Sequence, residues 1–173
     1  MRRIYWKTLG SGMKNSRPKI VAVSVAGALH NHHGQSCQDF FKHTRGKNLV
    51  AVVSDGAGSA KLGKIGAKTI CSTACDLLKN TEFADIPEQI RRVIKLAREK
   101  LVLHRRNSSK SESGIGDFAA TLVGVVCRGN RGVFFHIGDG AAIAVRGGFD
   151  DFVASHPQNC NFSCETFFYT QQA

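Results

Sequence analysis

An aspartate and two glycines follow directly on an apolar run in the stretch VAVVSDGAG, residues 50–58. This pattern is typical of a buried strand that ends in a ligand-holding turn. A carboxylate such as that of Asp55 is a preferred ligand of hard divalent cations, and Gly56 and Gly58 let backbone carbonyl groups approach an ion closely. Because Asp-Gly is also one of the commonest turn dipeptides, a plain turn between a strand and a helix is the alternative.

The elements that must position this turn can be predicted from the spacing of the apolar residues. Runs rich in β-branched residues indicate strands, and apolar residues at a spacing of three to four indicate helices. The predicted strands are Val21–Val25, Leu49–Ser54, Ala119–Cys127, Val133–Ile137 and Ala141–Val145, and the predicted helices are residues 63–79 and 87–105. Glycine-containing turns join the last three strands, so we expect them to form an antiparallel meander.

Strands, then helices, then strands again predict an α+β fold. The chain has 173 residues, of which 42% are hydrophobic and 21% charged, and this is ordinary for a single globular domain spanning residues 1–173. Within it we expect a basic arm over about 1–19 and a mobile loop over about 105–116. No apolar run approaches the roughly 20 residues of a membrane helix, and no secretory signal is visible, so we expect a cytoplasmic protein without a membrane partner.

The net charge of +11 is concentrated in two places, the N-terminal arm and the second predicted helix. From residue 91 to residue 110, along and just after that helix, eight basic residues accompany one acid, Glu99: Arg91, Arg92, Lys95, Arg98, Lys100, Arg105, Arg106 and Lys110. Such a field attracts phosphate-bearing partners in general. Aromatic residues are not interleaved with the basic ones, so a solvated helix face is favoured over a nucleic-acid interface.

The six cysteines do not follow a metal-binding pattern. Cys71 and Cys75 are four residues apart, as are Cys160 and Cys164, but neither pair has the CxxC spacing of a zinc site. In a chain without an export signal, reduced thiols are expected in place of a disulfide framework.

Five short motifs, taken in order, resemble the metal-dependent protein phosphatases of the type 2C class, in particular their bacterial-type branch. The motifs are Ser24–His30 running through Ser36-Cys37-Gln38-Asp39-Phe40, Asp55-Gly56-Ala57-Gly58-Ser59-Ala60, Phe118-Ala119-Ala120-Thr121-Leu122, His136-Ile137-Gly138-Asp139-Gly140, and the segment Asn161–Phe168 near the end. Their order along nearly the whole chain is more specific than any one of them.

The resemblance implies a four-layer α-β-β-α sandwich of two antiparallel sheets with helices outside. It also implies a serine/threonine protein phosphatase that acts on phosphoproteins by a water activated between two metal ions, usually manganese or magnesium. Asp55 would bridge both ions, while Asp39 and the carbonyl of Gly56 would bind one of them. Asp139 would lie near the centre and bind a weaker third ion, or be a plain turn aspartate.

This chain departs from the family pattern in ways that put activity in doubt. The family has at least two further metal-binding aspartates beyond the last matching motif, and the expectation is therefore a C-terminally truncated, weak or inactive phosphatase. The aspartates that lack the surrounding pattern and do not replace them are Asp76, Asp85, Asp117, Asp150 and Asp151. Gln35 and Ala57 stand where some relatives have a phosphate-binding arginine and a histidine.

Several alternatives remain at this point. His30, His32 and His33 are either proton donors or solvated loop residues. A non-catalytic phosphatase-like binding module follows from the missing aspartates. The stretch Gly58–Lys64 has the spacing of a P-loop, but Ile65 stands where a Ser or Thr must ligate magnesium. The aromatic tail, Phe162, Phe167, Phe168 and Tyr169, is expected to have nothing to pack against.

Overall fold

The computed structural model describes residues 5–8, 18–25, 37–107, 114–145, 152–157 and 166–171. The strands are β1 (Tyr5–Thr8), β2 (Phe40–Arg45), β3 (Leu49–Ser54), β4 (Leu122–Arg128), β5 (Arg131–Ile137), β6 (Ala142–Ala144) and β7 (Phe152–Ser155). The helices are α2 (Gly63–Leu78) and α3 (Ile86–Asn107), with short 3₁₀ helices η1 (Phe83–Asp85) and η2 (Ile115–Phe118).

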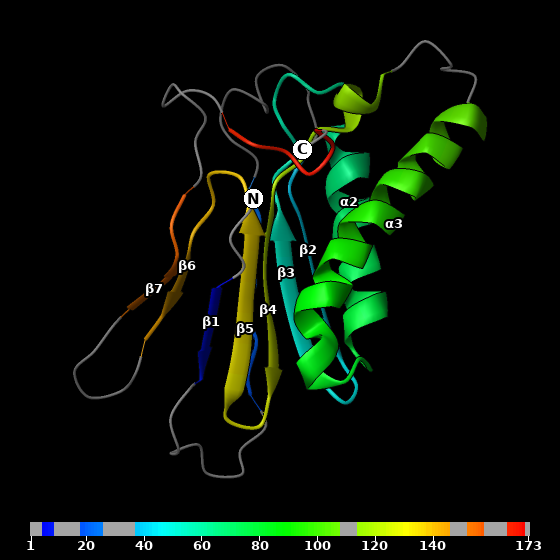
Figure 1. The fold of residues 1–173 in the computed structure, drawn as a ribbon. Helices are drawn as coiled ribbons and strands as arrows, with labels where there is room; N and C mark the ends of the chain where they lie inside the picture. The colour runs from blue at the N-terminus through cyan, green and yellow to red at the C-terminus, as the bar shows by residue number, and fades with distance from the viewer. Residues whose placement is uncertain are drawn as a thin grey trace.

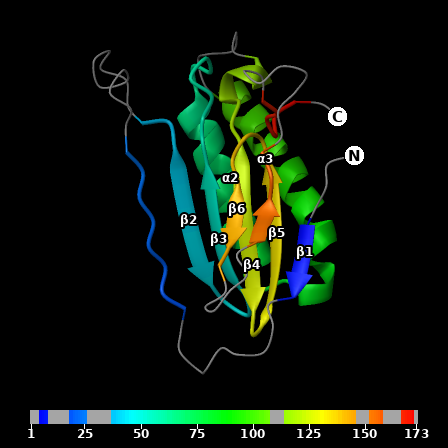
Figure 2. The same ribbon diagram turned by 90° about the vertical axis from the view of Figure 1, so that its left-hand side faces the viewer.

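Five of the strands form one antiparallel sheet in the order β1-β5-β4-β3-β2, and β6 and β7 form a separate two-stranded sheet. Helices α2 and α3 cover one face of the larger sheet, and the β6–β7 pair lies over the other (Figures 1 and 2). The chain therefore has the expected α+β architecture of antiparallel sheets and helices. The two predicted helices do lie on one outer face, and α3 continues to Asn107.

The core lies between the larger sheet and the two helices. One face of α2 is lined by small residues, among them Gly66, Ala67 and Ala74, so the helix can approach the sheet closely. A side chain at Gly66 would overlap the carbonyl oxygen of Phe118. The larger buried side chains include Val50, Val52, Ile70, Leu78, Ile86, Val93, Leu101, Phe118, Leu122, Val126, Val133 and Phe135.

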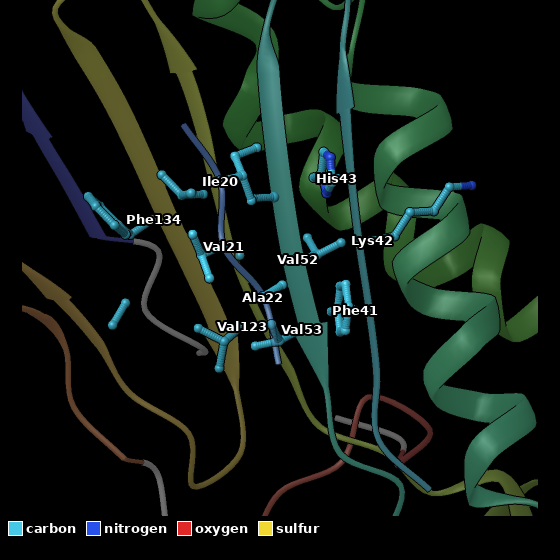
Figure 3. Close-up of a pocket in the computed structure, with 14 residues that line it drawn as sticks. Ile20, Val21, Ala22, Phe41, Lys42, His43, Val52, Val53, Val123 and Phe134 are labelled. Atoms are coloured by element: carbon cyan, nitrogen blue, oxygen red, sulfur yellow. The ribbon is translucent and has the colours of Figure 1, made fainter. Parts of the chain in front are cut away.

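The opposite face of the sheet carries an apolar hollow of about 210 Å³, shown in Figure 3. Its walls come from the segment Ile20–Ala22, from β2, β3, β4 and β5, and from Ala142 of β6. Phe41 and Val53 line it and remain 38% and 49% exposed. This face is therefore only partly covered by the described residues.

The predicted strand Val21–Val25 is wrong. Residues 18–25 run beside β2, with the Arg45 guanidinium donating to the Pro18 carbonyl at one end and Ser24 contacting Asp39 at the other (Figure 2). No ladder of backbone hydrogen bonds joins them to β2, and Val21, Val23 and Val25 are largely exposed. The pattern predicted an extended chain, which alone does not make a strand.

One connection differs from the expected meander. β4 and β5 form the predicted hairpin, but β6 leaves the sheet and pairs with β7. The turn at Gly138, where φ is +114°, redirects the chain at this point. Strands β1, β2 and β7 were not predicted, because β1 lies in the basic arm and β2 has only two apolar residues, which are followed by Lys42-His43-Thr44-Arg45.

Part of the aromatic tail is well packed, contrary to expectation. Tyr169 is fully buried, its hydroxyl donates to the carbonyl of Gly66 at 3.0 Å, and its backbone N–H donates to the carbonyl of Ala120 at 3.2 Å. Phe167 is 37% exposed, whereas Phe162 lies outside the described residues. Tyr169 thus joins the end of the described chain to α2 and to the start of β4.

Four cysteines of the described segments, Cys37, Cys71, Cys75 and Cys127, are free thiols. Cys160 and Cys164 lie outside these segments. Burial raises the pKa of the Cys71 thiol to about 12 and that of Cys75 to about 11, so both stay protonated at neutral pH. Neither α2 nor α3 is long and apolar enough to cross a membrane, and no other described helix is either.

Candidate functional site

The β2–β3 hairpin brings together the two aspartates that the resemblance pairs. Asp39 directly precedes β2 and Asp55 directly follows β3, and the antiparallel register places Phe40 opposite Ser54. The two acids therefore leave the sheet at the same end, and their carboxyl groups are hydrogen-bonded to each other. The Ser24 hydroxyl donates to Asp39 Oδ2 at 3.4 Å.

The electrostatics of Asp55 reflect crowding by other acids. Burial, the hydrogen bond with Asp39 and the negative charges of Asp39 and Asp139 together raise the pKa of its carboxyl from 3.8 to about 6, and burial has the largest effect. Carboxyl groups held this close favour either a shared proton or a bound cation. The cluster therefore has the electrostatic character of a cation site.

The turn after Asp55 requires glycine. A Cβ at Gly56 would lie 2.5 Å from the carbonyl carbon of Gly63, so the start of α2 can approach only a residue without a side chain. The side-chain amide of Gln38, with its nitrogen turned toward this loop, donates to the carbonyl oxygens of Ala57 at 2.9 Å and Gly56 at 3.2 Å. Because a carbonyl oxygen has two lone pairs, the Gly56 oxygen keeps one for a cation.

Thr121 holds Asp55 in place, a role that the sequence did not reveal. Its hydroxyl oxygen accepts the backbone N–H of Asp55 at 3.0 Å, and its own N–H donates to the Asp55 carbonyl at 2.8 Å. The Ser54 hydroxyl donates to the Thr121 carbonyl at 2.6 Å. The sequence offered one indication of this role: Thr121 is a hydroxyl residue directly before an apolar strand. Such a residue could have been interpreted as a hydrogen-bond partner of the Asp-Gly turn.

Gly138 positions the third acid. Gly138 has a φ of +114°, which residues with a side chain rarely adopt, and a Cβ at this position would lie 2.7 Å from the Thr121 methyl carbon. No other residue therefore fits well here. Asp139 follows in an exposed turn, close enough for its charge to act on Asp55. The structure thus places Asp139 beside the pair but not in hydrogen-bonding contact with it.

The remaining acids of the described segments have other contacts or lie elsewhere. Asp76 forms an ion pair with Lys42 at 3.7 Å, and Asp117 caps η2 by accepting the Gly114 N–H at 3.0 Å. Asp85 lies in η1, at the start of α3. The candidate residues His30, His32, His33, Gln35, Asp150 and Asp151 are outside the described part of the chain.

The P-loop alternative does not fit this fold. β3 pairs antiparallel with both β2 and β4, whereas a P-loop lies in a parallel βαβ unit. The α2 helix begins at Gly63, and Ile65 is part of its first turn.

We tested whether the cluster suits a metal ion. Oxygen atoms from Asp39, Asp55 and Gly56 are the donor type that manganese and magnesium prefer. Burial and the neighbouring acids raise the pKa of Asp55, and a bound cation would favour its charged form. In the parts of the chain that the structure describes, no three or more His, Cys, Asp or Glu side chains converge in a metal-holding arrangement. The donor set therefore fits a hard cation held by two carboxylates and a carbonyl.

Comparison with known proteins identifies the class. The family described as Protein phosphatase 2C matches residues 26–173, and the chain belongs to this family. Among solved structures, the chain is similar to the serine/threonine phosphatase of S. agalactiae, at 18% identity and a TM-score of 0.55. The match covers 92% of this chain and 57% of that one, so the present chain spans little more than half of its structural relative. A comparison with curated proteins gave no match.

Proposed function

We propose that this chain carries the core of a serine/threonine protein phosphatase that hydrolyses phosphomonoesters with manganese or magnesium. The observation that carries the proposal is the juxtaposition of Asp39 and Asp55 at the end of the β2–β3 hairpin, with Asp139 alongside. Membership of the phosphatase 2C family supports it.

The described residues have distinct roles in this proposal. Asp55 would contact two cations, and Asp39 and the Gly56 carbonyl would bind one of them. When bound, such a pair of cations brings water to the phosphorus and neutralises the charge that develops on the phosphoryl oxygens. Thr121 and Ser54 fix the Asp55 backbone, so the carboxylate is already oriented before any ligand arrives.

We also propose that turnover by this chain is slow. Two divalent cations carry four positive charges, and Asp39, Asp55 and Asp139 supply at most three negative ones. One ion should therefore be held weakly at ordinary concentrations. A non-catalytic module that binds phosphoproteins is the second candidate, and it is favoured by the lack of a converging three-ligand set in the described segments.

Two measurements test these proposals. Calorimetric titration with manganese should show weak binding that Asp55→Asn reduces more than Asp39→Asn does, because only Asp55 is placed to touch both ions. Asp85→Asn, which removes the same charge away from the cluster, is the matched control and should leave binding unchanged. A larger loss of manganese affinity in Asp39→Asn than in Asp55→Asn, or an unchanged affinity in Asp55→Asn, would contradict the bridging role.

The second measurement is manganese-dependent release of phosphate from p-nitrophenyl phosphate and a phosphoserine peptide. Slow turnover that disappears in Asp55→Asn is the expected result. Binding of the phosphopeptide without any turnover would instead favour the non-catalytic module. A rate of about 1 per second or more would overturn the proposal of an undercharged centre.

A further inference from the structure

The outward face of α3 carries a groove that the candidate site does not use. The lining residues recur at intervals of three and four along the helix, so they lie on one stripe, and Ile115 of η2 closes one end. The groove has a volume of about 860 Å³. From Arg91 to Arg106 the stripe is about 22 Å long, at 1.5 Å per residue.

The groove combines positive charge with an apolar floor. Five basic residues and one acid line it, namely Arg91, Lys95, Arg98, Arg105, Arg106 and Glu99. Between them lie the side chains of Ile94, Val102, Leu103 and Ile115, and Leu103 is 55% exposed. A complementary ligand must therefore be acidic and must also offer apolar side chains.

Other occupants fit this surface less well. A membrane-binding amphipathic helix presents its apolar face to lipid, but the apolar face of α3, including Val93, Ala97 and Leu101, is buried in the core. None of the lining residues is aromatic, so bases have no stacking platform. A second copy of this chain, at a net charge of +11, would bring like charge to the groove.

We infer that this groove, defined by the α3 stripe and Ile115, binds an acidic, leucine-bearing segment of the phosphoprotein substrate. The inference rests on the proposed function for the identity of the partner. A peptide of about seven residues in extended form spans a stripe of this length at about 3.3 Å per residue. The η2 segment connects the two regions, since Ile115 lines the groove and the Ala119 carbonyl just after η2 accepts the N–H of Ala57 beside Asp55.

The first experiment measures binding of a fluorescein-labelled peptide of about ten residues, rich in Glu and Asp with two leucines, by fluorescence anisotropy without added metal. Reversing two groove charges in Lys95→Glu/Arg98→Glu should weaken binding about tenfold or more. The control Arg92→Glu/Lys19→Glu changes the net charge equally at exposed positions outside the groove, and should bind nearly as well as the unmodified chain. Equal losses in the two variants would overturn the assignment.

Competition and turnover separate the remaining possibilities. Single-stranded RNA is added as a competitor of the labelled peptide. If RNA displaces the peptide at a lower concentration than unlabelled peptide does, and does not bind Lys95→Glu/Arg98→Glu, the ligand of the groove is nucleic acid and the peptide assignment is overturned. In turnover of phosphopeptides, Lys95→Glu/Arg98→Glu should raise KM for a peptide with acidic residues beside the phosphoserine and leave kcat unchanged. KM for a phosphopeptide without these acidic residues should not change. An unchanged KM for the acidic peptide would overturn the substrate assignment. The binding assay does not depend on turnover, so the two proposals can fail separately. A chain that binds the peptide in the groove but hydrolyses no phosphopeptide would contradict the proposed phosphatase activity and support peptide binding by the groove.

Discussion

Replacing Asn48 by alanine should destabilise the protein strongly, although the residue lies far from the candidate site. Asn48 is 1% exposed, and its amide group donates to the carbonyls of Leu78 at 2.7 Å and Thr81 at 2.8 Å. Its side-chain oxygen accepts the Arg128 Nε–H at 2.8 Å. One buried side chain thus joins the start of β3, the end of α2 and the end of β4.

The expected loss can be worked out from these bonds. Alanine removes one hydrogen-bond partner from the Leu78 and Thr81 carbonyls and from the Arg128 guanidinium, and a buried group left unsatisfied costs about 1 to 3 kcal/mol. Because Arg128 keeps its bonds to the Thr81 carbonyl and Glu82, we expect a total of about 3 kcal/mol. For a chain of this size such a loss lowers Tm by about 6 to 12 °C.

Urea denaturation followed by circular dichroism measures this loss. Asn80→Ala is the control, because Asn80 is exposed and accepts one long bond of 3.3 Å from the Lys47 N–H. It should change the free energy of unfolding by less than about 0.5 kcal/mol. If Asn48→Ala is no more destabilising than this control, the assigned network does not hold the sheet and helix together.

Two further predictions concern stability. Hydrogen bonds and charges from Lys47 and Arg128 lower the pKa of Glu82 from 4.5 to about 2, so its contribution to stability is complete above pH 4.5 and is lost as pH falls toward 2. In Glu82→Gln the free energy of unfolding should depend less steeply on pH between these values. An unchanged pH dependence in acid denaturation would contradict this. Gly66→Ala should cost about 1 to 3 kcal/mol, because its methyl group overlaps the Phe118 carbonyl; a Tm equal to that of the unmodified chain would show that α2 can shift freely.

The sequence predicted the elements whose apolar spacing alone indicates their secondary structure. The apolar spacing of α2 and α3 and the buried run of β3 needed no distant partner to be recognised. Asp55 could be singled out because a carboxylate between an apolar run and two glycines is typical of a ligand-holding turn. Asp39 could be paired with it only through the resemblance, since β2 itself was not predicted.

The errors arose where long-range pairing decides the structure. Val21–Val25 alternates like a strand, but a strand also needs backbone partners, and none of its residues forms a ladder with β2. The separation of β6 from β5 depends on the conformation of Gly138, which composition does not reveal. The support that Thr121 gives to Asp55 spans 66 residues, so the pairing of β3 with β4 is needed to bring the two residues together.

The packing of Tyr169 has a consequence for the order in which the chain folds. Its hydrogen bond to Gly66 closes a loop of 103 residues, whereas the β2–β3 and β4–β5 hairpins and the α2–α3 pair connect neighbours in the sequence. Contacts that close long loops form late, after their binding surface exists. Tyr169 should therefore contribute little to the rate of folding and act mainly by slowing unfolding. The residue therefore makes the domain long-lived after it has formed.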